Sequence, residues 1–359
     1  MRALHLALPI LAALAGCAPD PVRPTPEVQE TGPPGETPAP QEWTTRTVAG
    51  QPGIAGLGPD GVDALTSPLY WPLDVVVGPD GIPHFMDFNN HRVRALAADG
   101  VVTSDLASNL TGGSEEWLAK PTSAVFGDER TMYLISSARV HRVDLDTHVM
   151  TPLCFPGFGD CEETDIPQYA TGIALDGEGR LLMADSGRGT IMRLEPDDTL
   201  TTVAGTGVPG YDLDEGPALD VSLFMPHPDG LRADWGDRMV VANGVLYVAD
   251  TGNDRILSID LDTWHVTTLP FAIAEPADLA VGPDGTLYVP DHANHCIRYL
   301  RDGVPGVLAG ECGTPGYFDG ERGADTRFYG PFGVDVDADG NVYVADTDNQ
   351  VIRVISLGD

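Results

Sequence analysis

Short stretches in which apolar and polar residues alternate occupy most of this chain, and turn-forming residues separate them. Near the C-terminus, Pro331–Asp337 alternates, Asn341–Asp346 alternates again after a turn, and Val351–Ser356 follows as a third stretch. Alternation with a period of two predicts β-strands that bury one face, and the turns between them predict antiparallel hairpins. Segments such as Leu200–Gly205 predict a fourth strand elsewhere, so we expect units of four antiparallel strands.

The same unit occurs six times. Its first strand opens at Trp71, Lys120, Tyr169, His227, Glu275 and Gly330, at intervals of 49, 49, 58, 48 and 55 residues. In five units the fourth residue lies 13 positions before an equivalent residue on the next strand, but in the unit that opens at His227 this spacing is 20. We therefore predict a seven-residue insertion around Asp234–Asp237, between the first two strands of that unit. Regular units joined by variable loops indicate a repeat architecture.

The last unit lacks a fourth strand of its own, because three residues remain after Ser356. Thr45–Gly50, which precedes the first unit, closely matches the fourth-strand segment Leu200–Gly205. The N-terminal strand can therefore complete the last unit and close a ring. Six four-stranded sheets repeated around a ring predict an all-β fold, a six-bladed β-propeller.

The N-terminal segment has a different character. Met1–Arg2 precedes an apolar run, Ala3–Ala13, that is too short to span a bilayer, and the run leads into Leu14-Ala15-Gly16-Cys17, which resembles the lipobox of bacterial lipoproteins. The following residues, 18–41, contain eight prolines and few large apolar side chains, which is typical of an extended tether. We expect a lipoprotein signal peptide over residues 1–16, a lipidated (palmitate-bearing) Cys17 with a tether to residue 41, and the propeller over residues 42–359. Ala18 after the cysteine favours the outer membrane, facing the periplasm or the cell surface.

Composition narrows the choice of partners. The chain has 54 acidic and 20 basic residues, a formal net charge of −34, and a single lysine, Lys120. Nucleic-acid binding requires clustered basic residues, so this charge argues against it, and also against electrostatic docking on anionic lipid. Membrane attachment is therefore expected only through the lipid anchor, and the remaining partner classes are a protein, a peptide or a small molecule.

Two segments resemble NHL repeats: Asn341-Val-Tyr-Val-Ala-Asp-Thr-Asp-Asn349, and Val245–Ile256 with Val-Leu-Tyr-Val-Ala-Asp-Thr-Gly-Asn. The loops around Gly210-Tyr211 and Gly316-Tyr317 also resemble those of bacterial NHL proteins. The resemblance extends over about residues 43–359, and it is weakest in the second unit, where Ser136-Ser137-Ala138 replaces the expected Asp-x-x-Asn. It implies a propeller that binds protein, peptide or RNA partners, while related six-bladed propellers include lyases and lactonases. It predicts the fold and leaves the function open.

Residues that recur in every unit are expected to serve the fold. An aspartate ends the second strand of five units, and we interpret it as an acceptor that fixes the adjacent turn. These residues are Asp87, Asp185, Asp250, Asp291 and Asp346. The segment from Asp335 to Asp346 superficially resembles a calcium-binding loop, but the loop requires flanking helices, and the period of two here predicts a hairpin instead.

Residues that differ between units are free to serve function. Trp71, Lys120, Tyr169, His227 and Glu275 open innermost strands, so we expect them to ring one mouth of the central channel. Strand connectivity places His91, His292, His295 and the long glycine-rich loops on the same face, with His292 and His295 in exposed turns. We therefore predict that this face binds a protein, peptide or small ligand.

A metal-dependent lyase or hydrolase is the alternative, with zinc or calcium in the channel near His227 and Glu275. One histidine with one glutamate falls short of the three protein ligands that a catalytic zinc requires, so no cofactor is predicted. A carbohydrate-binding surface that uses Trp71, Trp117 and Tyr169 is a third hypothesis, which no motif supports.

The cysteines indicate an oxidising compartment. With Cys17 lipidated, four cysteines remain, which is an even number. We predict two local disulfides, Cys154–Cys161 across a short loop and Cys296–Cys312 at one rim of the fifth blade. A metal site that combines cysteine with His292 or His295 is the alternative.

Overall fold

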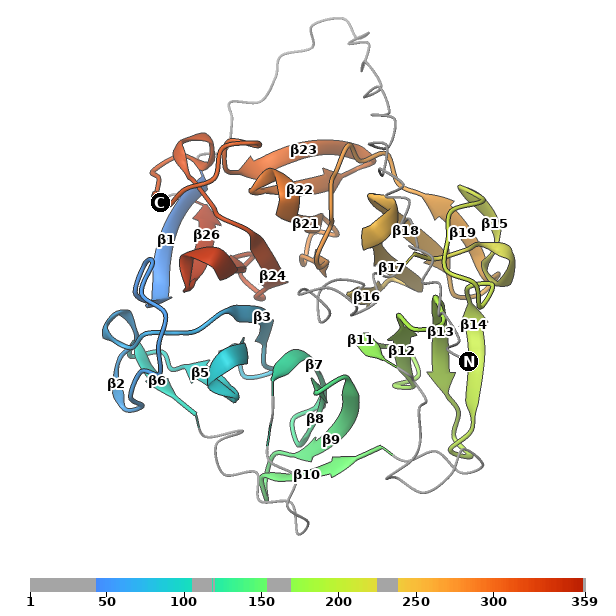
Figure 1. Cartoon of the computed structure of the whole chain (residues 1–359), viewed down its shortest axis with the longest axis horizontal. Helices are drawn as coiled ribbons and strands as arrows, with labels where there is room; N and C mark the ends of the chain where they lie inside the picture. The colour runs from blue at the N-terminus through green and yellow to red at the C-terminus, as the bar shows by residue number, and fades with distance from the viewer. Residues whose placement is uncertain (1–42, 105–117, 119, 154–168, 225–237, 358–359) are drawn as a thin grey trace, which may run out of the picture. The chain divides into compact units, whose positions relative to one another are not determined.

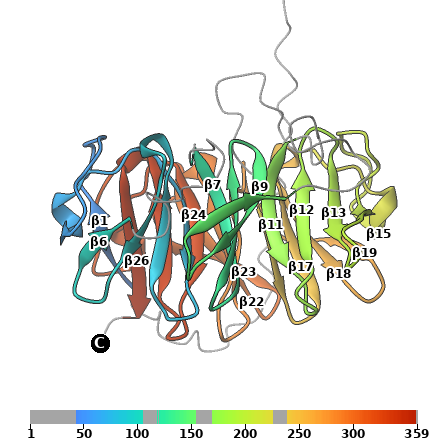
Figure 2. The ribbon, with the colours of Figure 1, turned by 90° about the horizontal axis from the view of Figure 1, so that it is seen from below.

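A computed structural model describes residues 43–104, 118, 120–153, 169–224 and 238–357, and these residues form a ring of six antiparallel sheets (Figure 1). The predicted six-bladed β-propeller is therefore confirmed. Each sheet runs radially, with its first strand at the central channel, and the strands of every sheet run between the two faces of the ring (Figure 2). No helix in the described part of the chain is long and apolar enough to cross a membrane.

Each blade is built from four strands, and blades one and four each gain a fifth at the outer edge. Blade one contains β3 (Pro72–Val77), β4 (Pro83–Asp87), β5 (Arg92–Leu96), β6 (Val101–Thr103) and the outer β2 (Val62–Asp63). Blade two contains β7 (Pro121–Asp128), β8 (Thr131–Ser136), β9 (Arg139–Asp144) and β10 (Val149–Pro152). Blade three contains β11 (Ala170–Leu175), β12 (Leu181–Asp185), β13 (Thr190–Leu194) and β14 (Leu200–Ala204).

The second half of the ring follows the same order. Blade four contains β16 (Met239–Ala242), β17 (Val245–Asp250), β18 (Arg255–Asp260), β19 (His265–Thr268) and the outer β15 (Glu215–Pro217). Blade five contains β20 (Ala280–Val281), β21 (Leu287–Asp291), β22 (Cys296–Arg301) and β23 (Val304–Ala309). Blade six contains β24 (Pro331–Val336), β25 (Val342–Asp346), β26 (Val351–Leu357) and β1 (Trp43–Gly50). Short 3-10 helices lie at Ala64–Thr66, Phe88–Asn90, Ala218–Asp220, Thr251–Asn253, His292–Asn294, Gly323–Asp325 and Thr347–Asn349.

The N-terminal strand closes the ring as the sequence predicts. β1 pairs antiparallel with β26, from Trp43 opposite Leu357 to Gly50 opposite Val351. The hydrophobic cluster around Ala49, Val75 and Ile352 then joins blade six to blade one. Equivalent clusters fill the other spaces between neighbouring sheets, so each blade buries its apolar faces against the next one.

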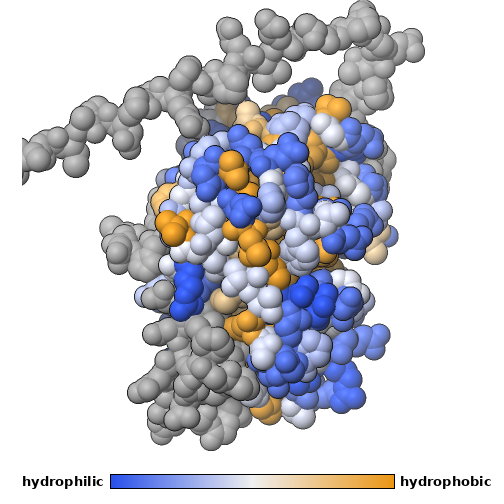
Figure 3. Space-filling view, turned by 90° about the vertical axis from the view of Figure 1, so that its right-hand side faces the viewer, coloured by the Kyte–Doolittle hydropathy of each residue, from blue (hydrophilic) through white to orange (hydrophobic). Residues whose placement is uncertain are grey.

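The connections define two faces, to which we give fixed names. The turn face carries the turns between second and third strands, for example Phe88–Asn90, together with the loops between blades. The hairpin face carries the hairpins between first and second strands, for example residues 78–82. Around the outer wall, the side with β14 and β15 shows narrow apolar bands between polar ones (Figure 3), and small apolar patches are normal on protein surfaces.

The recurring aspartates serve the fold, as predicted. Asp87, Asp250, Asp291 and Asp346 are fully buried at the end of the second strand. Each accepts an N–H bond from the segment that enters its own blade: Tyr70, Phe224, Ala274 and Tyr329 donate over 2.8, 2.8, 3.0 and 2.8 Å. An asparagine three residues later donates its amide to each of these carboxylates.

Buried arginines extend this network into the glycine-rich loops. Arg353 Nη1 lies 3.1 Å from Asp346 Oδ2, and the same guanidinium donates to the carbonyl oxygens of Phe318 and Arg327. Arg94 plays the same part beside Asp87. Burial nevertheless raises the pKa of Asp87 and of Asp346 to about 6, because desolvation outweighs the attraction of each arginine.

The insertion in blade four does not lie where the sequence predicts. The hairpin between β16 and β17 contains only Asn243 and Gly244, so the additional residues are not between these strands. Phe224 is equivalent to Tyr70 of blade one, since both donate an N–H to the recurring aspartate of their blade. Arg238 is equivalent to Asp74, since the next residue in each case, Met239 or Val75, pairs with the second strand two residues before that aspartate. The extra residues therefore precede Arg238 in the sequence. His227 and Asp234–Asp237 lie outside the described residues.

Candidate binding site at the mouth of the channel

Four of the predicted mouth residues share one backbone geometry. Trp71, Lys120, Glu275 and Gly330 have φ angles of 54°, 51°, 48° and 57°, in the left-handed region. The backbone N–H of each donates to a side chain of the preceding blade: Trp71 to Gln350 Oε1 (2.7 Å), Lys120 to His91 Nδ1 (3.0 Å), Glu275 to Asp254 Oδ1 (2.8 Å) and Gly330 to His295 Nδ1 (3.2 Å). The four positions are thus equivalent around the turn face.

The backbone conformation at these positions requires no particular side chain. Glycine adopts the left-handed region without strain, as at Gly330, whereas an ordinary residue there costs roughly 1–2 kcal/mol. Trp71, Lys120 and Glu275 therefore accept a conformational cost at a place where the repeat also works with glycine. Such strain is characteristic of functional positions.

Tyr169 is placed differently. Its N–H donates over 3.4 Å to Asp185 Oδ1, within its own blade, and its side chain is half-buried. The structure therefore brings Trp71, Lys120 and Glu275 to equivalent mouth positions, whereas Tyr169 enters its strand in another conformation. His227 and Trp117 lie outside the described residues, so the zinc and carbohydrate hypotheses that use them remain predictions.

The charges around the mouth are separated. Lys120 and His91 are exposed on the side of blades one and two, and Asp254 and Glu275 are exposed on the side of blades four and five. His91 Nδ1 accepts the N–H of Lys120, so in the neutral ring the proton is on Nε2. The Lys120 ammonium lies 5.4 Å from the centre of the Phe88 ring. One side of the mouth thus offers hydrogen-bond donors, and the opposite side offers carboxylates.

Below the mouth, Arg238 crosses the channel. Its Nη1 lies 2.6 Å from Asp74 Oδ2 of blade one and 3.9 Å from Asp278 Oδ2 of blade five. Its Nη2 donates to the carbonyl oxygen of Thr122 in blade two, and its Cζ lies 5.4 Å from the centre of the Phe332 ring in blade six. One side chain from blade four therefore contacts the innermost segments of four other blades.

The two carboxylates beside Arg238 are also built into the fold. Asp74 Oδ2 accepts the N–H of Ala124 over 3.2 Å, and Asp278 Oδ2 accepts the N–H of Val334 over 2.8 Å, so each bridges to the next blade. Burial raises the pKa of Asp74, and the Arg238 guanidinium opposes that shift. Burial and the nearby charge of Asp74 raise the pKa of Asp278 well above its usual range.

Apolar side chains fill the channel wall on the side of blades five, six and one. Leu73, Ala277 and Phe332 are 0–1% exposed and pack together with Phe88. His292 belongs to this wall: it is 6% exposed, its Nδ1 lies 3.3 Å from the Pro331 carbonyl oxygen, and its ring meets the Phe332 ring edge-on. The expectation of an exposed His292 is therefore wrong, because the ring satisfies a carbonyl and fills space between two blades. His295 is half-buried at the rim.

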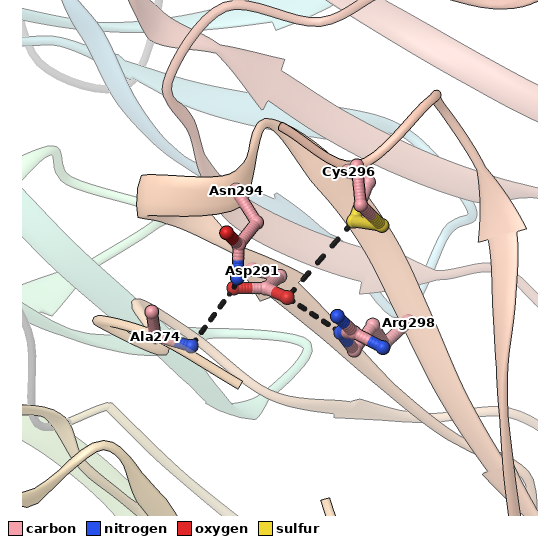
Figure 4. Close-up of a disulfide and its surroundings, with 6 residues drawn as sticks. Ala274, Asp291, Asn294, Cys296 and Arg298 are labelled. Atoms are coloured by element: carbon pink, nitrogen blue, oxygen red, sulfur yellow. Dashed lines mark hydrogen bonds and ion pairs between the residues drawn. A yellow bond between two sulfur atoms is a disulfide. The ribbon is translucent and has the colours of Figure 1, made fainter. Parts of the chain in front are cut away.

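One of the two predicted disulfides is confirmed. Cys296 and Cys312 form a bond with an Sγ–Sγ distance of 2.08 Å, next to the Asp291 network shown in Figure 4. Asp291 and these two cysteines are the one group of three potential metal-ligating side chains among the described residues, but sulfur atoms joined in a disulfide are not thiolate ligands. Cys154, Cys161 and Cys17 lie outside the described residues, so the other disulfide and the lipidation remain predictions.

The segment that resembles a calcium loop forms the predicted hairpin. Asp337 Oδ1 accepts the N–H groups of Asp339 and Asn341 over 3.0 and 2.9 Å, which closes the turn between β24 and β25. Asp335 Oδ2 accepts the Val77 N–H of blade one over 2.7 Å, and burial raises its pKa to about 7. These carboxylates are thus used in the turn and in the contact between blades.

Sequence reasoning missed Arg238 and the side chains that hold the mouth residues. In the other units the residue equivalent to Asp74 lies 13 positions before the recurring aspartate or its equivalent. The same count from Asp250 reaches Asp237, next to Arg238, so this spacing could have located Arg238 from the sequence. The left-handed conformation of the mouth residues had no comparable signal, because Trp, Lys and Glu are uncommon there.

The comparisons agree with the fold. An NHL repeat matches residues 328–355, which comprise the end of the loop before β24 and nearly all of the three inner strands of blade six. The chain is a six-bladed β-propeller that contains an NHL repeat. A curated relative, the chloroplastic protein Suppressor of Quenching 1 of Arabidopsis thaliana, is 24% identical over 243 residues, which cover 60% of this chain and 22% of that protein. The matched part of this chain thus corresponds to about a fifth of the length of that relative.

Solved structures with the same fold carry different names. A protein of Bacteroides thetaiotaomicron called an auxiliary nutrient binding protein has a TM-score of 0.64 at 17% identity, covering 88% of this chain and 76% of its own. A streptogramin B lyase has a TM-score of 0.53 at 14% identity, covering 90% of this chain and all of its own. At these identities the likeness concerns the fold alone, since one propeller supports both binding and catalysis.

Proposed function

We propose that this NHL-repeat propeller is a binding protein that recognises a peptide segment at the mouth of its channel, on the turn face. The observation that carries the proposal is the set of left-handed, non-glycine residues at the mouth. Trp71, Lys120 and Glu275 occupy positions where Gly330 gives the same backbone without strain. The left-handed conformation of a non-glycine residue costs roughly 1–2 kcal/mol at each position, and glycine would avoid this cost. The presence of Trp, Lys and Glu therefore supports a role for their side chains.

The charge separation at the mouth favours a peptide over a uniformly charged ligand. Lys120 and the Nε2–H of His91 suit a carboxylate or a carbonyl group, whereas Asp254 and Glu275 suit an ammonium or a guanidinium group. A peptide carries both kinds of group at a fixed separation, and Trp71 adds an aromatic surface. The auxiliary nutrient binding protein with the same fold is compatible with a binding role for such a propeller.

The experiment replaces the mouth residues by the glycine that blade six uses. Lys120→Gly and Glu275→Gly are expected to leave the melting temperature unchanged or to raise it, because each relieves left-handed strain. The control is Asp302→Gly, which relieves the same kind of strain (φ 51°) in a hairpin-face turn. The probe is a pool of free hexapeptides passed over immobilised full-length protein, and mass spectrometry identifies the retained sequences.

The parent protein should retain peptides that carry separated acidic and basic groups, and the Asp302→Gly control should retain the same set. Lys120→Gly should retain peptides with acidic groups about tenfold less than the parent does. Glu275→Gly should retain peptides with basic groups about tenfold less, because each variant removes one charge-assisted hydrogen bond. If both variants retain peptides as the parent does, the mouth is not the binding surface.

We propose further that the propeller is exported and attached to the outer membrane through lipidated Cys17, with residues 18–41 as the tether. Support comes from the apolar N-terminal run and the small residues that precede this cysteine. Palmitate labelling of cells that express the parent and Cys17→Ser tests the anchor. Labelling should disappear in the variant, and equal labelling of both proteins would refute lipidation at this residue.

A further inference from the structure

A hollow on the hairpin face lies between blades one and two, away from the channel mouth. Its volume is about 340 Å³, and it is lined by Pro79, Asp80, His84, Phe126, Glu129 and Leu145. This volume is at the lower end of the range for small-ligand sites. The wall is aromatic and aliphatic, since the rings of His84 and Phe126 lie 5.2 Å apart, and the two carboxylates stand exposed at its rim.

The other blades show how unusual this hollow is. The position of His84, three residues before the recurring aspartate or its equivalent, is tyrosine in four of the other five blades and leucine in the remaining one: Tyr133, Leu182, Tyr247, Tyr288 and Tyr343. The position of Phe126 is aliphatic in the other five: Val77, Leu175, Val241, Val281 and Val336. Blade one thus replaces a long phenol by a shorter imidazole, and blade two supplies a flat ring opposite it.

The charge of the hollow is also an exception. In blade five the equivalent turn carboxylate, Asp284, lies 3.3 Å from Arg301 Nη2. Blade one has Ala97 at the place of that arginine, and no described basic side chain forms an ion pair with Asp80 or Glu129. Two uncompensated carboxylates therefore face an apolar pocket.

His84 supports a cationic occupant of this pocket. Its side chain is 6% exposed, and no atom of the described residues lies within hydrogen-bond distance and geometry of its Nδ1. Burial lowers the pKa of His84, and the nearby Asp80 opposes this shift only in part, so the ring is neutral at neutral pH. A neutral imidazole next to two carboxylates does not repel a positive charge.

We propose that the hollow formed by His84, Phe126, Leu145, Asp80 and Glu129 binds the side chain of a lysine or arginine residue from a partner polypeptide. The aliphatic stem packs against Phe126 and Leu145, as long basic side chains commonly pack on apolar surface. The cationic group reaches Asp80 and Glu129 at the rim. This site is separate from the mouth, so the two can be tested independently.

The test uses the full chain with its histidines labelled with carbon-13 at Cε1. The probe is Nα-acetyl-lysine amide, and Nα-acetyl-norleucine amide is the control ligand, since it has the same stem without the charge. At low ionic strength the lysine probe should shift the His84 resonance, which the spectrum of His84→Tyr identifies by its absence. The norleucine compound should produce no comparable shift, and equal shifts from both compounds would overturn the cationic specificity.

Saturation-transfer NMR, which detects binding of the probe to the protein, locates the interaction when it is repeated on three variants. His84→Tyr restores the tyrosine that recurs in other blades, fills the hollow and should abolish binding of the lysine probe. Glu129→Gln should weaken binding about fivefold, as expected for one partly solvated ion pair. Asp339→Asn, which removes an exposed turn carboxylate of blade six, should bind the probe like the parent.

Unchanged binding by Glu129→Gln would overturn the proposal, and so would unchanged binding by a folded His84→Tyr. If His84→Tyr fails to fold, the result for Glu129→Gln is the test of the proposal, because Glu129 is exposed and its change to glutamine leaves the core intact. The mouth variants Lys120→Gly and Glu275→Gly should bind the lysine probe as the parent does, which separates this result from the test of peptide recognition.

Discussion

Arg238 gives the most specific prediction about the stability of the ring. Its guanidinium lies 2.6 Å from Asp74 and 3.9 Å from Asp278, and Arg238 and Asp74 are only 2–3% exposed. Two opposite charges about 4 Å apart attract by about 4 kcal/mol at an effective dielectric constant of about 20. Arg238→Ala removes this attraction and leaves two carboxylates buried without a counter-ion. Breaking a buried pair in this way costs about 3–5 kcal/mol, a large part of the roughly 5–15 kcal/mol that stabilises a typical protein.

The loss should depend on pH with a definite sign. The carboxyl pKa values of Asp74 and Asp278 are raised by burial even with the arginine present, and they rise further without it. A carboxyl group with a raised folded-state pKa destabilises the protein when it is ionised, so the cost is complete above that pKa. The cost shrinks as the pH falls toward the unfolded-state value of about 4. The difference between Arg238→Ala and the parent should therefore be largest at pH 8 and smallest near pH 5.

Urea denaturation followed by tryptophan fluorescence measures this difference at each pH. A triple variant, Arg238→Ala with Asp74→Asn and Asp278→Asn, is the matched control, because each asparagine oxygen can still accept the N–H of the next blade. The triple variant should recover more than half of the loss at pH 8 and show little pH dependence. A loss in Arg238→Ala that is below about 1 kcal/mol, or equal at pH 5 and pH 8, would refute the buried-charge reasoning.

Three other predictions follow from the contacts described above. Deleting Trp43–Gly50 removes the partner of β26, so the shortened protein should expose a strand edge and aggregate; a truncated monomer that melts like the parent would contradict ring closure. Breaking the Cys296–Cys312 bond, by reduction or by Cys296→Ser with Cys312→Ser, should lower the free energy of unfolding by about 3 kcal/mol, the value for a loop of this length. Equal urea midpoints with and without reductant would argue against a stabilising bond. In the parent, burial raises the pKa of Asp335 to about 7 and of Asp87 and Asp346 to about 6, so stability measured by denaturation should increase as the pH falls from 8 to about 5. Below about pH 4 stability should fall again, because turn carboxylates such as Asp144 have lowered pKa values and lose their N–H bonds when protonated; a flat profile from pH 8 to 5 would count against the burial effect.

The ring was predictable because its information is local and repeated. Alternation over five to eight residues predicts each strand, and a turn carboxylate such as Asp337 accepts N–H groups two and four residues later. The match between Thr45–Gly50 and Leu200–Gly205 predicted the closing strand for the same reason. Cys296 and Cys312 were also accessible to this reasoning, since they are close in sequence and border neighbouring strands.

The contents of the channel were not predictable in this way. Arg238 contacts Asp74 and Asp278 only because the ring brings together residues that are far apart in the sequence. The insertion of blade four was predicted between its first two strands, and with that alignment Arg238 did not fall at the position of Asp74. His292 directly follows Asp291, and the residue in this position is buried in the other blades that carry the recurring aspartate as well, whereas the exposed His91 corresponds to the half-buried His295. Burial in this turn therefore follows the position after the aspartate, but that position holds Phe, Ser, Thr or His, so its hydropathy gave no common signal in the sequence.

Arg238 lies between the two proposed sites. Arg238 and the wall of Leu73, Ala277 and Phe332 lie between the turn-face mouth and the hairpin face, and a ligand that entered from the mouth would have to break the Arg238–Asp74 pair. That pair costs about 3–5 kcal/mol to break, comparable with the whole binding energy of a millimolar ligand, which is about 4 kcal/mol. We therefore expect a peptide at the mouth to stop above Arg238 and to leave the binding of a basic side chain in the hollow of His84 unaffected. Because sites without shared contacts act additively, saturating one should leave affinity at the other unchanged within a factor of about two. Coupling larger than this would mean that Arg238 moves when either ligand binds.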